Sequence, residues 1–430
     1  MKKAFTVVSS HRVASRTAFR GRCLSFASSA KSAVWSSSPR NLHVQCSSSN
    51  TLPLCERRAV HTSSLEELRK WRSWAQDKAV SVGDKYRIAD GGPDSHDLLR
   101  ELEWMLEDVV SHVPMSSSPH CMPNGSKDCQ EKQPNTFLNA ETYDGPSETL
   151  LETLAGVRHV QHADPLRALK WRDIKNFEPS DFQRVVYLRA SLEELSTLWT
   201  ERVQHRRPFQ YVVGCAHWRD FVLFVKEGVL IPRPETEQMI DLAQDLIDLQ
   251  PNLAKGLWAD LGTGSGALAI GLGSILHPQG NIVAVDVSDE ALFIASLNIQ
   301  RYELQDKIRV LKGSWFSPLE DLKGKLAGVL SNPPYIPSSH IATLQAEVGC
   351  YEPKKALDGG QQGTDDLTCI CEGASWALQS GGYMILETNG GVQAETVANV
   401  LDSMAGGPFC DIQLVKDYAG IVRFVKAMHV

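Results

Sequence analysis

Four consecutive residues, Asn332-Pro333-Pro334-Tyr335, carry groups suited to holding a planar NH₂ group. They follow an apolar run, Ala327–Ser331, that is typical of a buried strand. Two prolines stiffen the backbone and remove two N–H donors, so nearby carbonyls remain available as acceptors. Asn332 adds a side-chain carbonyl, and Tyr335 offers a flat face for an amide or a base. The alternative is a rigid turn without function, which the strand-end placement downstream of a glycine-rich loop disfavours.

The glycine-rich loop, Gly262-Thr263-Gly264-Ser265-Gly266, stands between a predicted strand and a predicted helix. Glycines let the backbone approach a ligand and expose amide N–H groups at a helix N-terminus. Asp286 ends the next predicted strand, where a carboxylate can accept both hydroxyls of a ribose. A dinucleotide site or a plain tight turn would compete, but the spacing is G-x-G-x-G rather than G-x-G-x-x-G. The string resembles the S-adenosylmethionine loop of Rossmann-like methyltransferases and, with Asp286, predicts a nucleoside-bearing cofactor.

The two motifs together predict methyl transfer from a sulfonium to a weak, conjugated nitrogen. Asn332 Oδ1 and the Pro333 carbonyl would hold the NH₂ group and orient its lone pair. Alignment and exclusion of water would supply most of the rate. No general base is required, because the nitrogen becomes acidic once it is methylated. We therefore expect no catalytic role for the histidines at positions 217, 277 and 340.

The elements that must position these motifs alternate between strands and helices over residues 206–430. The expected strands are Phe221–Val225, Val229–Ile231, Gly256–Leu261, Asn281–Val287, Ile308–Lys312, Ala327–Ser331 and Tyr383–Thr388, and the expected helices are Glu237–Leu249, Ala267–Leu276, Glu290–Arg301, Thr368–Leu378 and Val392–Met404. Two further runs, Ile412–Lys416 and Ile421–Lys426, predict a hairpin. The alternation indicates an α/β fold with a parallel sheet covered on both faces.

Residues 56–205 predict a small, all-helical N-terminal domain. A helical pattern starts at Ser63 and Ser64, a second covers His96–Val110, and a third covers Ser180–Val203. Residues 111–147 are polar and rich in proline, which predicts a disordered insertion. We expect two folded domains, 56–205 and 206–430.

The composition excludes several classes of protein. The chain has 430 residues with 42% hydrophobic and 22% charged, which excludes wholesale disorder. Its longest apolar stretch, near Ala267–Leu276, is far short of the ~18 residues of a membrane span. The net charge is -7, and residues 56–430 alone carry 36 basic and 51 acidic side chains. That acidity disfavours coating of nucleic acid and suits a basic protein partner.

Residues 1–55 contain eight basic residues, 13 serines and no acidic residue. This composition is typical of an organellar transit peptide, and the alternative is an ordinary disordered tail. The serines favour the chloroplast stroma over the mitochondrial matrix. We expect cleavage near residues 45–60.

The string Leu230-Ile231-Pro232-Arg233-Pro234-Glu235-Thr236-Glu237 is the most selective motif. Residues 180–430 resemble the release factor glutamine methyltransferases (the PrmC/HemK family) through this string, both motifs above, and the segments Arg207–Gly214, Glu347-Val348, Glu352-Pro353 and Ala356–Gly360. The Asn-Pro-Pro-Tyr turn alone is shared with adenine-N6 methyltransferases. The run Gly214–Asp220 and the leader look more like plant and algal members.

The resemblance implies methyl transfer from S-adenosylmethionine to the side-chain N5 of a glutamine. That glutamine lies in the Gly-Gly-Gln motif of class I peptide chain release factors, and the resemblance implies that residues 56–205 recognise this substrate. The resemblance places Gly262, Thr263, Gly264, Ser265 and Gly266 along the cofactor, Asp286 at its ribose and Trp315 beside its adenine. It implies that Asn332, Pro333, Pro334 and Tyr335 bind the glutamine amide, with Asn332, Pro333 and Tyr335 as the catalytic group and Asn332 also facing the cofactor. Arg233 and Glu235 would shape the acceptor channel or support the cofactor, or form a folded connector.

Two other functions stay open from the residues. An adenine-N6 DNA or RNA methyltransferase shares the Asn332–Tyr335 turn, although the acidic charge and the lack of an evident target-recognition domain argue against it. A non-catalytic assembly factor that keeps the cofactor fold is the other alternative. We expect a monomer that binds no metal, no membrane and no nucleic acid stably.

Overall fold

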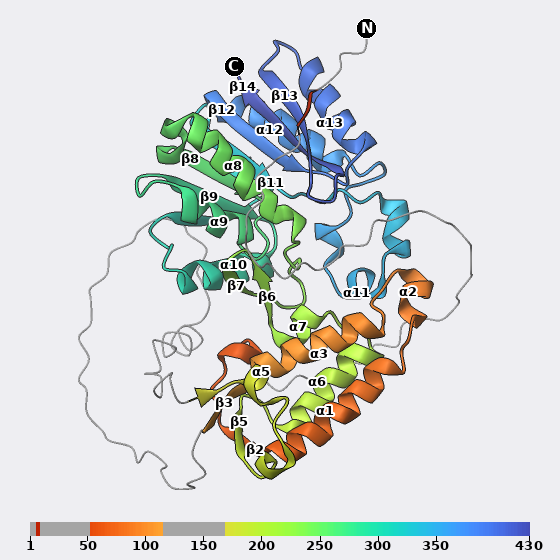
Figure 1. Ribbon diagram of the computed structural model, residues 1–430. Coiled ribbons are helices and arrows are strands. Elements are labelled where there is room, and N and C mark those ends of the chain that lie inside the picture. Colours follow the sequence, from red (N-terminus) through yellow and green to blue (C-terminus); the bar gives the residue numbers. More distant parts are fainter. Residues whose placement is uncertain (1–5, 9–51, 115–167) are drawn as a thin grey trace, which may run out of the picture.

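The computed structural model describes residues 6–8, 52–114 and 168–430. The predicted leader apart from 6–8 and 52–55, and the predicted insertion apart from 111–114, lie outside these residues. The described chain forms an N-terminal body (52–114 and 168–213) and a C-terminal body (214–430), one below the other in Figure 1. Within the described residues, no helix has both the length and the apolar character needed to span a membrane.

The N-terminal body is built around three helices. Its helices are α1 (Leu65–Val80), α2 (Lys85–Asp90), α3 (Ser95–Val109), α5 (Trp171–Ile174), α6 (Leu192–Gln204) and α7 (Phe209–Val213). Capping boxes begin the helices α1 and α3, with Ser64 before α1 and Asp94 before α3. Buried Trp199 of α6 donates its Nε1 proton to Ala75 O of α1 at 2.9 Å. The apolar faces of α1, α3 and α6 therefore enclose one core.

The prediction of an all-helical domain is wrong in one respect. The strands β2 (His61–Ser64), β3 (Val110–Pro114), β4 (Ala168–Leu169) and β5 (Val185–Leu188) form an antiparallel sheet in the order β2-β5-β3-β4. The helix expected over Ser180–Val203 begins only at α6. Val185 and Val186 lie in β5 instead, paired with β2, because β-branched side chains suit a pleated surface.

The C-terminal body contains the predicted sheet. Its strands are β8 (Leu257–Leu261), β9 (Asn281–Asp286), β10 (Ile308–Lys312), β11 (Leu326–Ser331), β12 (Leu378–Glu387), β13 (Phe409–Lys416) and β14 (Val422–His429), in the order β13-β14-β12-β11-β8-β9-β10, with β1 (Thr6–Val8) at the β13 edge. Only β14 runs antiparallel to its neighbours, so the predicted terminal hairpin is confirmed. The strand expected at Val229–Ile231 is wrong, because Ile231 N donates to the Glu352 carboxylate and not to a strand.

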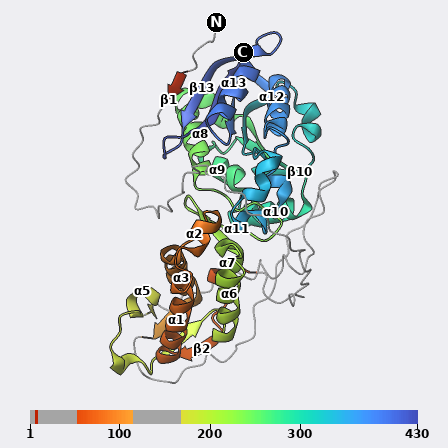
Figure 2. The same cartoon turned by 90° about the vertical axis from the view of Figure 1, so that its right-hand side faces the viewer.

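Helices cover both faces of this sheet, as the alternating pattern predicted (Figures 1 and 2). One face packs against α8 (Gln238–Leu249), α9 (Ala267–Ile275) and α10 (Asp289–Arg301), and the other against α12 (Asp365–Ala377) and α13 (Val392–Ser403). A short helix, α11 (Ala346–Gly349), lies outside these layers toward the N-terminal body. The α/β fold class is therefore confirmed.

The sheet has a topological switch point between β8 and β11. From β8 the chain continues through β9 to β10 on one side, and from β11 through β12 on the other. A crevice opens at the carboxyl ends of parallel strands where the order reverses, and ligands bind there. The glycine-rich loop follows β8 and the Asn-Pro-Pro-Tyr turn follows β11, so the fold brings both motifs to this crevice.

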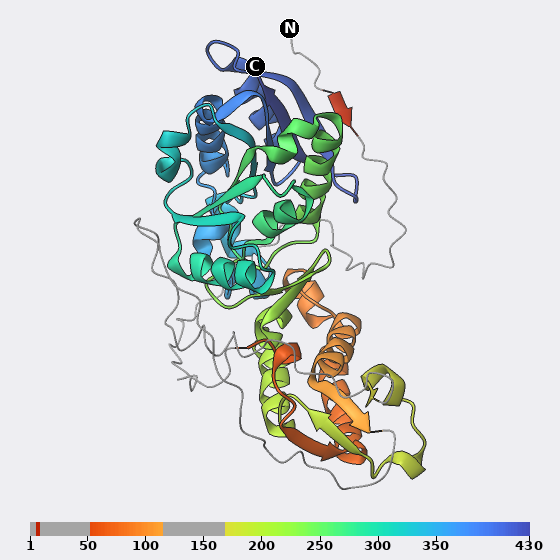
Figure 3. The same cartoon turned by 90° about the vertical axis from the view of Figure 1, so that its left-hand side faces the viewer.

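The helix α7 and the ribbon of β6 (Cys215–Trp218) and β7 (Phe221–Phe224) join the two bodies, as the yellow-green chain in Figure 3 shows. The core of the N-terminal body includes Val212 and Cys215, so it continues past the expected boundary at residue 205. It also includes Leu54, which is fully buried. Loss of the Leu54 side chain would leave a cavity in this core and lower the stability of the N-terminal body.

Gly328 gives a test of the sheet packing. A Cβ at this residue of β11 would lie 2.3 Å from the ring of the buried Trp258 on β8. We expect Gly328→Ala to lower the free energy of unfolding by about 1–3 kcal/mol, because the added methyl group would overpack the core. Urea denaturation measures this change. Gly349→Ala is the control, since its nearest contact would be an ordinary 3.6 Å. Equal stability of the two variants would contradict this packing.

Candidate functional site

The glycine-rich loop has the backbone that only glycine adopts readily. Gly262, Gly264 and Gly266 have φ angles of +73°, +56° and +84°. A Cβ at Gly266 would lie 3.3 Å from Ala295 Cα in α10, whereas nothing lies within 4 Å of a Cβ at Gly264. The loop therefore packs tightly at its helical end and faces open space at Gly264.

A buried carboxylate lies beneath the loop. Asp260 Oδ2 accepts hydrogen bonds from Thr263 Oγ1 at 2.6 Å and from Ala269 N at 2.9 Å. Among the described residues, nothing bonds to its other oxygen, Oδ1. Burial raises the pKa of Asp260 to about 7. Asp260 links the loop to the start of α9, a role that the sequence analysis did not assign.

Asp286 lies where the sequence predicts, at the end of β9 and beside the loop. Its Oδ2 accepts from Gly264 N and its Oδ1 accepts from Ser288 N, both at 2.9 Å. Burial raises the pKa of this half-buried carboxyl group. Each carboxylate oxygen has two lone pairs, so both retain capacity for ribose hydroxyls.

The ring of Trp315 stands over the start of the loop. A Cβ at Gly262 would lie 3.3 Å from Trp315 Cζ3. Trp315 has a left-handed φ of +49°, which is rare for a bulky residue, and its Nε1 donates to Asp366 Oδ1 at 3.1 Å. The crevice thus combines an approachable backbone, a carboxylate and an aromatic face. These donors and surfaces fit a nucleoside such as that of S-adenosylmethionine.

A hydrogen bond joins the two strand residues that directly precede the motifs. Ser331 Oγ donates to Leu261 O at 2.6 Å, inside the sheet. These two residues are paired across β11 and β8, and each directly precedes one motif. Asn332 and Gly262 therefore begin side by side. Pro333 and Pro334 are buried, while Asn332 and Tyr335 are half-buried.

A chain of hydrogen bonds orients the side chain of Asn332. The buried hydroxyl group of Thr236 donates to Glu387 Oε2 at 2.6 Å and accepts from Asn332 Nδ2 at 3.1 Å. Thr236 has one proton, so when the carboxylate receives it, only the amide NH₂ of Asn332 can face Thr236. The amide oxygen of Asn332 is then left to accept a hydrogen bond from an incoming NH₂ group.

Glu387, at the end of β12, also holds Tyr335. The Tyr335 hydroxyl donates to Glu387 Oε1 at 3.3 Å. Glu387 is 1% exposed, and burial raises its pKa to about 7, with Arg423 nearby opposing the rise. The sequence analysis assigned no function to Glu387 or Thr236. The signal was available as a carboxyl group that ends the apolar run Tyr383–Leu386 at the crevice.

Arg233 has a partner within the protein. Its Nη2 bonds to Glu352 Oε1 at 2.5 Å, and Glu352 Oε2 accepts from Ile231 N at 3.2 Å. The guanidinium thus holds the Glu352 segment against the Leu230–Glu237 string. The structure brings Arg233 to the wall of the site, and its ion pair favours the supporting role over direct contact with an acceptor.

Comparisons with known proteins point to one family. The family model of the methyltransferase small domain matches residues 237–348. The release factor glutamine methyltransferase of Thermosynechococcus vestitus is 44% identical over 246 residues, which cover 57% of this chain and 82% of that protein. The chain belongs to the release factor glutamine methyltransferase family. The family member of Synechocystis is 42% identical over 60% of this chain and 86% of its own.

Membership of the release factor glutamine methyltransferase family confirms the predicted enzyme class and, with the fold, implies S-adenosylmethionine as the methyl donor. A solved structure, a ribosomal protein L11 methylase from Lactobacillus delbrueckii subsp. bulgaricus, is 20% identical with a TM-score of 0.34, covering 48% of this chain and 83% of that one. The relation to the family comes from the sequence relatives.

A second polar cluster lies at the junction of the two bodies. Asp108, Cys215 and His217 have ligand atoms within 4.8 Å of one another, and Cys55 Sγ lies 3.8 Å from Cys215 Sγ. Burial raises the pKa of Asp108 to about 6, and the Cys55 thiol and burial raise that of Cys215. The raised pKa keeps the Cys215 thiol protonated at neutral pH, and a protonated thiol is a poor metal ligand, so we assign this cluster no function.

The raised pKa of Glu387 predicts how stability depends on pH. The folded protein retains this proton up to about pH 7, whereas the unfolded chain releases it near the ordinary value of 4.5. Stability is thus lost as pH rises through this window. Glu387→Gln removes this titration while Asp260 retains its own, so urea midpoints measured from pH 4.5 to 8 should fall less steeply than in the wild type. An unchanged slope would contradict a neutral, buried Glu387.

Proposed function

We propose that this protein methylates the side-chain N5 of the glutamine in the Gly-Gly-Gln motif of organellar class I peptide chain release factors and so supports translation termination. The carrying observation is the Glu387–Thr236–Asn332 chain, which turns an amide oxygen toward the crevice beside the glycine-rich loop. The family of its relatives supports glutamine as the acceptor.

The cofactor site follows from the residues around the loop. Gly262–Gly266 offer the approachable backbone, Asp286 the acceptor for ribose hydroxyls, and Trp315 the face for adenine. S-adenosylmethionine supplies an electrophilic sulfonium methyl when it is bound. Asp260 keeps the loop in its left-handed conformation by binding Thr263 and the first turn of α9.

The acceptor site presents two oxygens and a ring. Asn332 Oδ1 and the Pro333 carbonyl accept the two protons of the glutamine NH₂ group, and this turns the nitrogen lone pair toward the methyl. Tyr335 packs against the planar amide, and its hydroxyl bond to Glu387 fixes the ring. The contribution is alignment and exclusion of water, as the buried Pro333 and Pro334 indicate. The methylated nitrogen then loses a proton to solvent.

The proposed location is the chloroplast stroma, with the mitochondrial matrix as the alternative. The acid-free leader supports an organelle, and the cyanobacterial relatives support the plastid. The folded part acts as a monomer on a protein. Its surplus of acidic side chains over residues 56–430 suits a basic, ribosome-associated partner better than naked nucleic acid.

The first test measures tritium transfer from labelled S-adenosylmethionine. The protein should label a plastid class I release factor and should not label the same factor with the Gly-Gly-Gln glutamine changed to Ala. Naked DNA and RNA serve as the comparison for the adenine-N6 alternative. Labelling of the glutamine variant, or of nucleic acid at physiological salt, would overturn the proposal.

The second test separates catalysis from cofactor binding. We expect Asn332→Ala to lower kcat by about 10²-fold or more, because the acceptor amide loses its main orienting partner. Its affinity for S-adenosylmethionine, measured by calorimetry, should stay within about threefold, since the loop and Asp286 remain. Full activity of this variant would exclude the proposed role and favour a different acceptor geometry.

A further inference from the structure

The segment after the Asn-Pro-Pro-Tyr turn leaves the active site and returns to it. We call residues 336–360 the bridging segment. Ile336 N donates to Leu357 O and Gly359 N donates to Ile336 O, both at 2.9 Å. These backbone hydrogen bonds join the two ends of the bridging segment beside Tyr335. Gln393 Nε2 donates to Tyr335 O at 2.9 Å and fixes the same point. Both ends of the bridging segment are therefore anchored next to Tyr335, and the segment connects this residue to its far end.

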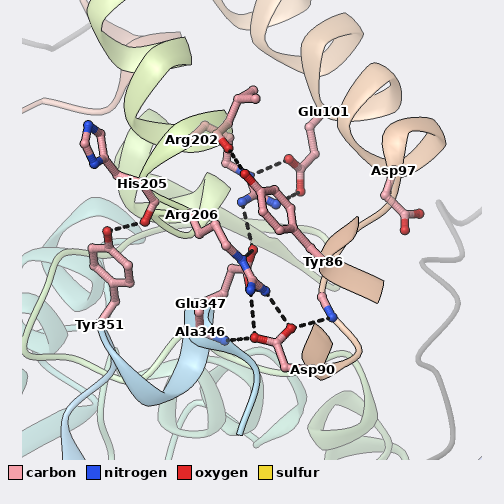
Figure 4. Close-up of polar contacts among 12 residues, drawn as sticks. Tyr86, Asp90, Asp97, Glu101, Arg202, His205, Arg206, Ala346, Glu347 and Tyr351 are labelled. Atoms are coloured by element: carbon pink, nitrogen blue, oxygen red, sulfur yellow. Dashed lines mark hydrogen bonds and ion pairs between the residues drawn. The ribbon is translucent and has the colours of Figure 1, made fainter. Parts of the chain in front are cut away.

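The N-terminal body binds the middle of the bridging segment through ion pairs and hydrogen bonds, as Figure 4 shows. Glu347 of α11 pairs with two arginines at the end of α6 and just beyond it. Arg202 Nη1 lies 3.2 Å from Glu347 Oε1, and Arg206 binds both carboxylate oxygens, with its Nε at 3.1 Å. Arg202 is also held by Glu101 of α3, at 2.6 Å and 3.0 Å.

Asp90, the last residue of α2, adds two further contacts to this network. It accepts Arg206 Nη1 at 2.7 Å and the backbone N–H of Ala346 at 3.1 Å, so it touches both bodies (Figure 4). A third contact lies nearby, where Tyr351 OH donates to His205 O at 2.6 Å. The N-terminal body thus binds the segment at Ala346, Glu347 and Tyr351.

The backbone of Arg206 has an unusual conformation. Its φ of +59° is in the left-handed region that favours glycine. Its guanidinium lies 4.5 Å from the centre of the Tyr86 ring, between the carboxylates of Asp90 and Glu347. A strained backbone that persists at a contact between two bodies points to a constraint on geometry.

The charged side chains of this network are largely buried, so each is costly to leave without a partner of opposite charge. The side chains of Arg202 and Glu347 are 3% and 9% exposed. Desolvation makes such pairs weak sources of net stability, but a single arrangement satisfies them and loss of one partner is costly. A network of two guanidiniums and three carboxylates therefore fixes one orientation of the N-terminal body on the segment.

We propose that Asp90, Glu101, Arg202, Arg206 and Glu347 form an ionic clamp that positions a folded protein substrate. The clamp sets the N-terminal body, to which we assign contact with the substrate away from the reacting glutamine, at a fixed place relative to Tyr335. This rests on the proposed function. Glu347 and Arg206 are positioning residues that act through the bridging segment and touch neither cofactor nor glutamine.

The test compares Glu347→Gln with a matched control, Glu227→Gln. Glu227 also pairs with an arginine at the junction, Arg207, but its side chain is 52% exposed and lies outside the clamp. For Glu347→Gln we expect KM for a complete class I release factor to rise about tenfold or more. Its kcat should stay within about threefold, and its affinity for S-adenosylmethionine within about twofold. Glu227→Gln should match the wild type.

Hydrogen exchange supplies a readout that needs no substrate. Amides of α11 and α2 should exchange at least tenfold faster in Glu347→Gln, while those of β8 and β11 should not change. If Glu347→Gln fails to fold, Asp90→Asn tests the same clamp with the same expected directions. An unchanged KM, a loss confined to kcat, or unchanged exchange in α11 would overturn the proposal. If the wild type labels no release factor, the proposed function fails, and exchange still decides whether the clamp exists.

Discussion

The hydroxyl group of Thr236 has one proton and two neighbours, and the acceptor site depends on how that proton is used. Above the Glu387 pKa of about 7 the carboxylate is ionised and its Oε2 receives this proton at 2.6 Å, so the lone pair of Thr236 must accept from Asn332. This requirement turns the amide oxygen of Asn332 toward the crevice. Because Glu387 also binds Tyr335, one buried carboxyl group fixes both side chains that we propose as contacts of the acceptor. The apolar surroundings strengthen these bonds and exclude competing water.

The sheet and the N-terminal body place this chain of bonds where it can act. The switch point between β8 and β11 puts the cofactor loop and the acceptor turn side by side. The bridging segment then ties Tyr335 to Arg202 and Arg206 through Glu347. Buried ion pairs therefore join the segment that follows the Asn-Pro-Pro-Tyr turn to the N-terminal body.

Local chemistry explains what the sequence could predict. The α/β fold, the strand-end motifs and the place of Asp286 follow from patterns of a few neighbouring residues, whereas the place of Trp315 was predicted from the resemblance to the family. Thr236, Asp260 and Glu387 were missed as a set because their role arises from contacts between distant elements. The strand β5 was missed because its neighbours predict helix, and pairing with β2 decides the outcome. The clamp joins residues more than 100 positions apart, so only the fold reveals it.

The most direct measurement of the central claim is tandem mass spectrometry of a plastid release factor after incubation with the protein and S-adenosylmethionine. An oriented amide oxygen beside the cofactor predicts a single added methyl group, on the side-chain nitrogen of the Gly-Gly-Gln glutamine. Fragment ions that place the methyl group on another residue, or an unmodified factor beside a methylated nucleic acid, would contradict the account.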